Sequence, residues 1–320
     1  MPATVRLITA TGPTVGHGHL ARTLALAEAR WPAGVDRELA LASGAPSPTE
    51  SARALAAGLR LVDHRAAPPQ GAAVSIDVPD PGGLAAAVKA DRLVVFDDRE
   101  GFAGQAAVVV QPSLPRWSGR ATARRVLAGY DWAPIGAEWR QWIHRSPVTG
   151  DDTPHILVCF GGSDPHDVTG RISPVIEADD RWRTTIVVGP DYRGRSRSAA
   201  LVRDPDDLPR RVAEADLLVI GGGTMKFEVA ALGRPAILLA ASDDQLPVGP
   251  PFASTGAALW LGDGRAIEPE IVHDAVAGLL TDEAARAAMS TAGRQVVDGG
   301  GADRLAAEIA ALADAQTSAS

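Results

Sequence analysis

Several features that would narrow the class of this protein are scarce in its 320 residues or missing from them. Only one cysteine occurs and aromatic residues make up 4%, so no disulfide forms within the chain and its cores must consist of Ala, Val, Leu and Ile. Cys159 lies in an apolar run, which favours a packed strand residue over a nucleophile. No apolar stretch approaches the roughly 20 residues that span a bilayer, and the first ten residues lack the apolar segment of a secretory signal. We therefore expect a cytoplasmic protein without a membrane span.

An excess of positive charge is also missing. The chain has 39 acidic and 31 basic residues and a formal net charge of −8. Because binding to phosphate backbones needs a dense basic surface, we expect no nucleic-acid partner. Apolar residues make up 46% and charged residues 22%, the balance of a soluble globular protein. The length is sufficient for two domains of ordinary size.

Short apolar runs alternate with helical patterns along the whole chain, which is typical of parallel βαβ units. In the first half we predict strands at 5–10, 38–42, 60–62, 93–96 and 107–111. In the second half we predict them at 156–160, 184–188, 217–220, 236–239 and 259–261. A polar segment at 139–153 separates the two sets and is the predicted linker.

This order predicts an α/β protein with two Rossmann-like, doubly wound domains, residues 1–140 and 154–300, followed by a helix at 301–316. In such sheets, ligands bind beyond the carboxyl ends of the strands, at a switch point in strand order. We therefore expect a ligand cleft between the carboxyl ends of the two sheets.

Three glycine-rich turns follow predicted strands and open predicted helices. They are Thr11–His19, Gly161–Pro165 and Gly221–Thr224. Glycine lets the backbone approach a ligand, and the amides at a helix start attract anions. Any one turn is equally explained by tight packing, but three at corresponding strand ends favour phosphate binding. None matches a P-loop or a dinucleotide fingerprint.

Polar residues stand close to the later turns. Glu228 lies one helical turn after the third glycine turn, where its carboxylate would accept both ribose hydroxyls of a nucleotide, or would cap the helix. Asp244 and Gln245 follow a strand and can bind neighbouring sugar hydroxyls. Asp243–Asp244 and Asp97–Asp98 are acidic pairs, but no further ligand stands at metal-binding spacing, so we expect neither a metal nor a cofactor.

Two histidines lie in the first turn. His17 and His19 are two residues apart, so they do not both face one point of an extended turn. His19 lies at the helix start, where the helix dipole disfavours its imidazolium form and keeps it competent as a general base. We favour His19 over His17, with Gly18 between them allowing a close approach of the ligand.

The ordered set of motifs resembles a known group of GT-B-fold enzymes along most of the chain. This group comprises the UDP-sugar hydrolase of the pseudaminic acid pathway and related spore-coat polysaccharide glycosyltransferases. Segment Gly16–Arg22 resembles the group's Gly-x-Gly-His-x-x-Arg pattern. Segment Phe160–Pro165 matches closely, and Asp216–Glu228 followed by Leu232–Pro235 and Gln245 resembles the nucleotide-binding half.

The resemblance implies that UDP lies mainly on the C-terminal domain, with Glu228 on the ribose. It implies that His19 acts at the anomeric carbon of the sugar, which makes the N-terminal domain the one that holds the acceptor and the base. It further implies that the final helix returns to the N-terminal domain.

Three departures from the hydrolase pattern bear on the activity. Asp244 replaces the Asn before the Gln, Arg99 replaces a Tyr after the acidic turn, and Lys226 replaces a small hydroxyl residue. The missing Tyr argues against the hydrolase, and an Asp-Gln pair resembles the sugar clamp of many GT-B glycosyltransferases. Arg99 and Lys226 either favour an acidic sugar or acceptor or are ordinary exposed cations.

The leading hypothesis is an inverting, metal-independent glycosyltransferase that moves a sugar from a UDP-sugar to a small soluble acceptor. His19 would deprotonate the acceptor while backbone amides stabilise the departing diphosphate with help from Lys226. The amides expected there belong to Gly161, Gly162, Ser163, Gly222, Gly223 and Thr224. Two alternatives remain open: a hydrolase that uses water at the same site, and an inactive nucleotide-sugar sensor.

Overall fold

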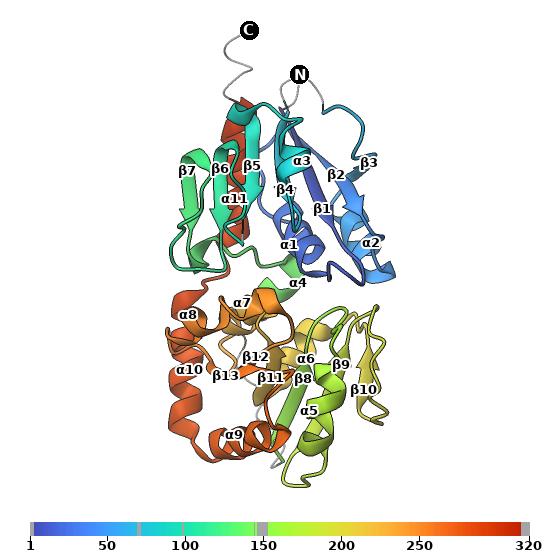
Figure 1. Cartoon of the computed structure of the whole chain (residues 1–320), viewed down its shortest axis with the longest axis vertical. Coiled ribbons are helices and arrows are strands. Elements are labelled where there is room, and N and C mark those ends of the chain that lie inside the picture. The colour runs from blue at the N-terminus through green and yellow to red at the C-terminus, as the bar shows by residue number, and fades with distance from the viewer. Residues whose placement is uncertain (1–2, 69–71, 98, 144, 146–152, 315–320) are drawn as a thin grey trace. The chain divides into compact units, whose positions relative to one another are not determined.

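The computed structural model describes residues 3–68, 72–97, 99–143, 145 and 153–314. The chain divides into two compact units (Figure 1). The first contains the residues up to Ala137 together with those from Gly299 onward, and the second contains Glu138–Asp298. Helix α4 (Ala137–Arg140) contains the first point at which the chain passes between them.

The first unit is built on a parallel sheet of seven strands. Their order is β3-β2-β1-β4-β5-β6-β7, so the chain reverses its direction across the sheet between the neighbouring strands β1 and β4. Such a reversal is the switch point of a doubly wound sheet. The strands are β1 (Ala3–Ala10), β2 (Val35–Ser43), β3 (Arg60–Val62), β4 (Ala73–Asp77), β5 (Leu93–Phe96), β6 (Gln105–Gln111) and β7 (Thr122–Ala128).

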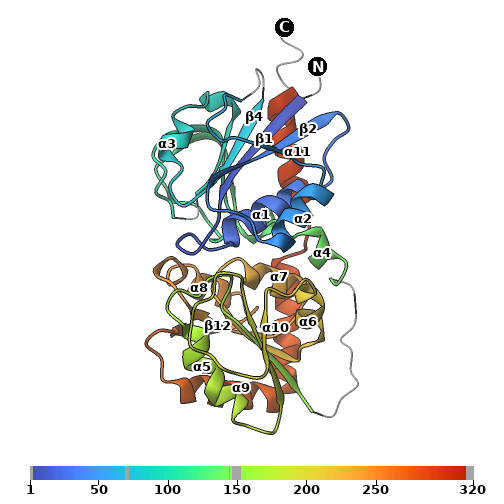
Figure 2. The same cartoon turned by 90° about the vertical axis from the view of Figure 1, so that its right-hand side faces the viewer.

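The C-terminal helix belongs to the core of this first unit, although it follows the second unit in sequence. Figure 2 shows α11 beside β1. Ala302, Leu305, Ala306 and Ile309 are fully buried in one apolar cluster with residues of β1. A Cβ atom at Gly301 would lie 2.2 Å from the Ala133 carbonyl oxygen, so only glycine permits this approach. The helical segments of the unit are α1 (Gly18–Ala27), α2 (Pro48–Ala56), α3 (Gly82–Ala85), η1 (Ala90–Arg92), η2 (Tyr130–Trp132) and α11 (Gly301–Asp314).

The second unit repeats the same topology with six parallel strands in the order β10-β9-β8-β11-β12-β13. Its switch point therefore lies between β8 and β11. The strands are β8 (His155–Cys159), β9 (Arg183–Val188), β10 (Leu201–Arg203), β11 (Leu217–Gly221), β12 (Ala236–Ala240) and β13 (Leu259–Asp263). The helical segments are α5 (Val168–Glu177), α6 (Leu208–Glu214), α7 (Met225–Ala231), η3 (Asp243–Gln245), α8 (Gly249–Ala253), α9 (Pro269–Thr281) and α10 (Glu283–Val296).

The strands β8, β11 and β12 are buried at every residue. Their continuous apolar sequences suit a parallel sheet that is covered on both faces. Cys159 lies in this layer, and burial raises the pKa of its thiol to about 11. The thiol therefore stays protonated at neutral pH, and the burial of Cys159 within β8 confirms the prediction of a packed strand residue.

The predicted strands are confirmed with small shifts at their ends, but three strands escaped the sequence patterns. Strand β4 is only five residues long and follows a segment rich in Pro and Gly, which favoured a loop. Strand β7 is a sheet edge whose exposed residues include Thr122, Arg124 and Arg125, and polar residues are common on edge strands. Strand β10 is a three-residue edge. Of these, β4 matters most because it ends at Asp77.

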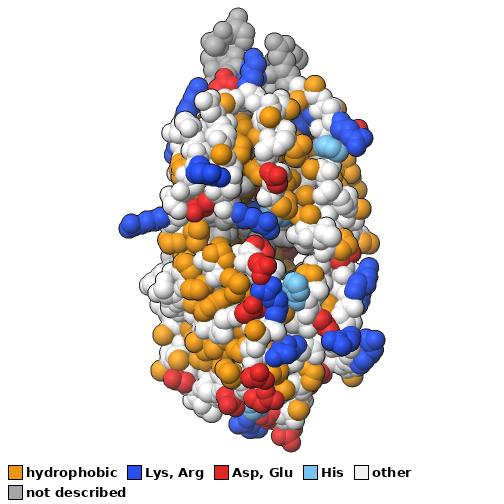
Figure 3. All heavy atoms as spheres, viewed as in Figure 1, with side chains coloured by type: hydrophobic (Ala, Val, Ile, Leu, Met, Phe, Trp, Pro, Cys, Tyr) orange, Lys and Arg blue, Asp and Glu red, His pale blue; other side chains and the backbone are white. Residues whose placement is uncertain are grey.

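In the described part of the chain, no helix is both long enough and apolar enough to cross a bilayer. On the face of the molecule drawn in Figure 3, Lys and Arg side chains are scattered among acidic ones and form no continuous basic patch.

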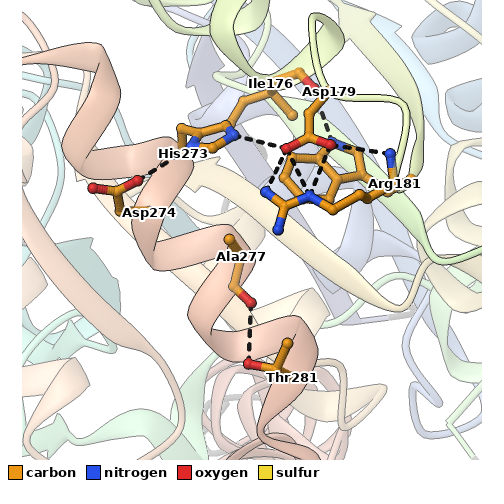
Figure 4. A network of polar contacts seen from close by, with 8 residues as sticks. Ile176, Asp179, Arg181, His273, Asp274, Ala277 and Thr281 are labelled. Atoms are coloured by element: carbon orange, nitrogen blue, oxygen red, sulfur yellow. Dashed lines mark hydrogen bonds and ion pairs between the residues drawn. The ribbon is translucent and has the colours of Figure 1, made fainter.

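A polar network joins α9 of the second unit to the segment before β9 (Figure 4). The His273 Nε2 atom lies 2.9 Å from an Asp179 carboxylate oxygen, and its Nδ1 lies 3.2 Å from Asp274. Arg181 also pairs with Asp179, and the Trp182 ring lies 5.5 Å from the His273 ring. The hydrogen bonds to Asp179 and then to Asp274 raise the pKa of His273 above its ordinary 6.5.

This raised pKa predicts a pH-dependent contribution to stability. A group whose pKa is higher in the folded state stabilises fully below its unfolded pKa and loses that effect as the pH rises through the folded value. We expect the melting temperature of the wild type to exceed that of His273→Gln most at about pH 5.5, and the difference to shrink by about pH 9. The melting-temperature difference between the wild type and Asp179→Asn should likewise be larger at low pH than at high pH. A difference that is the same at every pH would contradict the assignment of His273 as the titrating group.

Candidate functional site

In the first unit, the switch point brings together residues from two distant segments. Strand β1 leads into the turn that contains His19, the second residue of α1. The neighbouring strand β4 ends at Asp77, which pairs in register with Thr9 of β1. Both residues therefore lie at the carboxyl edge of the sheet, where doubly wound domains bind ligands.

Asp77 joins His19 and Arg22 into one cluster. The His19 Nδ1 atom lies 2.7 Å from Asp77 Oδ1. Arg22 donates two hydrogen bonds to the same carboxylate, from Nε at 2.8 Å and from Nη2 at 2.6 Å. The side chains of Arg22 and Asp77 are each 3% exposed, whereas that of His19 is 19% exposed. The histidine is thus the member of the cluster that a ligand can reach.

The charges in this cluster determine which nitrogen of His19 is available. Burial acts to raise the pKa of Asp77, but the charges of Arg22 and His19 and their hydrogen bonds outweigh it and hold that pKa below its usual range. An ionised carboxylate only accepts hydrogen bonds, so Nδ1 of His19 carries the hydrogen. In the neutral ring, Nε2 is then the free base, the arrangement that a carboxylate imposes on a catalytic histidine.

His17 is engaged elsewhere. Its Nδ1 lies 2.8 Å from a Glu50 carboxylate oxygen and 3.2 Å from the Thr11 hydroxyl. Glu50 also accepts a hydrogen bond from the Ser47 amide in the capping box of α2. The two histidines of the first glycine turn therefore have different partners, and Gly18 between them is the first residue of α1.

The first carboxylate of the acidic turn after β5 binds backbone amides. One oxygen of the buried Asp97 accepts hydrogen bonds from the amides of Gly101 and Phe102. Asp98, the second member of the predicted acidic pair, lies outside the described residues. Arg99 is exposed.

In the second unit, the two later glycine turns follow the neighbouring strands β8 and β11. Gly161 has a φ of +94°. Gly162 packs closely on Gly189, and a Cβ atom at Gly189 would lie 2.3 Å from the Gly162 Cα. The amides of Gly162 and Ser163 have no acceptor among the described residues. Asp164 accepts hydrogen bonds from the amides of Val168 and Thr169 and so caps the start of α5.

The third turn is supported by Gln245. Its Oε1 atom accepts hydrogen bonds from the amides of Gly222 and Ala241, each at 2.9 Å. The Gly222 amide also donates to the Leu239 carbonyl, so it is fully used within the protein. Among the described residues, the next two amides, of Gly223 and Thr224, have no acceptor. The turn thus has two backbone amides without an acceptor, and the Nε2 group of Gln245 likewise has no acceptor among the described residues.

The remaining predicted side chains lie around this edge. Glu228 is half-buried in the first turn of α7. Asp244 is exposed in η3, and its carboxylate has no partner in the described structure. Lys226 is 2% exposed, with its ammonium on backbone carbonyls of the third turn. The glycine turns and these side chains therefore gather at the carboxyl ends of β8, β11 and β12.

Three charged residues of the sites escaped the sequence analysis. Asp77 ends an unrecognised strand, and Arg22 was noted only as part of a motif. Arg265 donates to Asp263 at 2.7 Å and 2.8 Å and pairs with Asp243 at 2.7 Å. The i, i+3 spacing of His19 and Arg22 on one helix face was the one available signal. Among the described residues, no three His, Cys, Asp or Glu side chains form a group able to hold a metal ion.

Comparison with known proteins gives partial relatives. The spore coat polysaccharide biosynthesis protein SpsG of Bacillus subtilis is 27% identical over 178 residues, 49% of this chain and 50% of that protein. The UDP-N-acetylglucosamine–N-acetylmuramyl-(pentapeptide) pyrophosphoryl-undecaprenol N-acetylglucosamine transferase of Mycobacterium bovis is 35% identical over 192 residues, 54% of this chain and 44% of that protein. The chain thus spans about half the length of these curated relatives. No protein-family model matches it.

Solved structures match over nearly the whole chain. MurG of Acinetobacter baumannii superposes with a TM-score of 0.62 at 15% identity, covering 96% of this chain and 99% of that one. The chain has the GT-B fold. The UDP-GlcNAc 2-epimerase of Neisseria meningitidis matches equally well, with a TM-score of 0.61 at 11% identity over 96% of this chain and 99% of that one. Proteins with different activities therefore share this fold, and the activity of this chain has to be inferred from the residues of its sites.

The buried ion pair of Arg22 and Asp77 predicts that substitutions at the two positions have coupled effects on the free energy of unfolding. Removing one partner leaves an uncompensated buried charge, which costs on the order of 3 kcal/mol. We expect Arg22→Met and Asp77→Asn each to lower the free energy of unfolding by about that amount, and the double variant to lose less than the sum. Urea unfolding measures all three.

Arg210→Met is the matched control, because Arg210 is 44% exposed in its pairs with Asp207 and Glu214. Loss of exposed pairs should cost less than about 1 kcal/mol. Equal losses for Arg22→Met and Arg210→Met would contradict the buried cluster.

Proposed function

We propose that this protein is an inverting, metal-independent glycosyltransferase that transfers a sugar from a UDP-sugar to a small soluble acceptor. The observation that carries the proposal is the cluster of His19 with Asp77 and Arg22 at the switch point of the first sheet. This cluster holds a histidine in the tautomer that a general base requires, in a chain with the GT-B fold.

The donor half of the proposal rests on the second unit. The unbonded amides of Gly162, Ser163, Gly223 and Thr224 suit the oxygens of a diphosphate, because backbone N–H groups at a strand–helix turn favour anions. Glu228 would accept the ribose hydroxyls. Asp244 and the Nε2 group of Gln245 offer an acceptor and a donor for the hydroxyls of the sugar.

The proposed reaction is a single displacement. The acceptor hydroxyl gives its proton to His19 Nε2, its oxygen forms a bond to the anomeric carbon, and the bond from that carbon to the diphosphate oxygen breaks. UDP leaves with the electron pair of the broken bond, and the backbone amides stabilise its growing charge. Asp77 stabilises the imidazolium that forms at His19. One displacement without an enzyme nucleophile inverts the anomeric centre.

The names of the relatives support the donor class. The Mycobacterium bovis relative is named as a transferase of N-acetylglucosamine from a UDP-sugar, and its acceptor is linked to undecaprenol. The SpsG relative is named for spore coat polysaccharide biosynthesis. These names support a UDP-sugar donor, while the small soluble acceptor remains a proposal for this chain.

Water as the acceptor is the second candidate, because a histidine base that is partly exposed can also deprotonate water. A panel of UDP-sugars separates the two. We expect UDP release to be slow with each sugar nucleotide alone and to accelerate when the right acceptor is added. Rapid release of UDP and free sugar without an acceptor would overturn the transferase in favour of a hydrolase.

The general base predicts a specific loss of activity. His19→Ala should lower kcat by about 100-fold or more, since general-base catalysis contributes on the order of 10² to 10⁴. Asp77→Asn should lower kcat as well, because the amide no longer enforces the tautomer. UDP affinity, measured by calorimetry, should stay within about twofold in His19→Ala, because the diphosphate site lies in the other unit.

His17→Ala is the matched control, two residues away and paired with Glu50. It should keep kcat within about tenfold of the wild type. If His17→Ala and His19→Ala lost kcat equally, or if His19→Ala lost none, the assignment of the base would be wrong.

A further inference from the structure

The third glycine turn of the second unit has a buried ammonium group behind it. Lys226 is 2% exposed, and its Nζ atom donates to the carbonyls of Gly222 at 2.8 Å and Gly223 at 3.2 Å. The ring centroids of Phe227 and Phe252 lie 4.3 Å and 5.9 Å from the same atom. The Lys226 ammonium therefore donates hydrogen bonds to the backbone of the turn and packs against two aromatic rings.

The geometry of the peptide group links these two carbonyls to two amides. The Gly222 carbonyl shares a peptide group with the Gly223 amide, and the Gly223 carbonyl shares one with the Thr224 amide. No peptide bond in the described part of the chain is cis, and in a planar trans peptide C=O and N–H point in opposite directions. Because both carbonyls point at Lys226, both amides point away from it.

These two amides are the ones without an acceptor among the described residues. The preceding Gly222 amide is already bound by Leu239 and Gln245. Gln245 thus binds one peptide group of the turn, while the Lys226 ammonium binds the next two. Successive amides that point to one side form a concave site for an anion.

The charge of Lys226 adds to this orientation. A hydrogen bond from an ammonium polarises the carbonyl that accepts it, and hydrogen bonds in a chain strengthen one another. The Gly223 and Thr224 amides should therefore be stronger donors than ordinary ones. An anion on the far side of the turn also experiences the positive charge itself, at low local dielectric.

We propose that Lys226 is a positioning residue for the diphosphate of the donor, which it serves without touching by turning the Gly223 and Thr224 amides toward it. The inference rests on the proposed function, since it takes the third glycine turn as the diphosphate site. It differs from a direct contact between Lys226 and phosphate, because the ammonium lies behind the turn and is engaged with two carbonyls.

The test compares ligands that share or lack the phosphates. Lys226→Met keeps the length and apolar stem of the side chain and removes the ammonium. Calorimetry with UDP, inorganic pyrophosphate and uridine measures each dissociation constant for the wild type and the variant. We expect the affinities for UDP and pyrophosphate to fall about tenfold and the affinity for uridine to be unchanged. Lys226→Arg, which keeps the charge and the donors, should restore much of the loss.

Lys89→Met is the matched control. Lys89 is the other lysine of the chain and is exposed in the first unit. Its replacement changes the net charge by the same amount and should leave all three affinities unchanged.

Two results would overturn the role of Lys226 and leave the proposed function intact. One is wild-type affinity of Lys226→Met for UDP and pyrophosphate. The other is an equal loss for UDP and uridine, which would show that Lys226 only supports the fold. A wild type that binds neither UDP nor pyrophosphate would instead remove the proposed function and this inference together.

A measurement on the wild-type protein tests the proposal independently if Lys226→Met does not fold. In amide-resolved NMR spectra, addition of pyrophosphate should shift the Gly223 and Thr224 signals more than that of Gly222, whose amide is already bound within the protein. Shifts confined to other amides would contradict the proposal.

Discussion

The candidate sites depend on one constraint of the doubly wound sheet, the reversal of strand order between two neighbouring parallel strands. At that point the two connections leave toward opposite faces of the sheet, so no helix covers the strand ends between them. In the first unit this constraint brings together His19 and Asp77 after β1 and β4. In the second unit it places Gly162 and Gly223 after β8 and β11.

The two units use this common position with different chemistry. The first unit buries a carboxylate, and Arg22 compensates the cost of removing it from water. The orientation of His19 is therefore organised before any ligand arrives. The second unit offers backbone amides in its third glycine turn, where Gln245 binds the Gly222 amide and Lys226 binds the Gly222 carbonyl. Fixed dipoles of this kind need little reorganisation when charge develops on a leaving group.

Much of the fold followed from the sequence because its strands are continuous apolar runs that end in glycine turns. Strand β4 was not predicted, because its five residues follow a segment rich in Pro and Gly. Without that strand, Asp77 had no place at the sheet edge and the partner of His19 stayed hidden. Gln245 was predicted to bind sugar hydroxyls, and the structure shows in addition that its Oε1 atom accepts hydrogen bonds from two backbone amides. The side-chain pattern alone gave no indication of that use.

The sequence by itself determined the alternation of strands and helices, the position of the glycine turns and the choice of His19 as the candidate base. These features are local, since they depend on residue types within one strand or one turn. Only the tertiary structure decided that Asp77, 58 residues away, holds His19, because strand order selects that neighbour. It also decided that Lys226 lies behind the third turn, since packing against Phe227 and Phe252 sets the direction of its side chain.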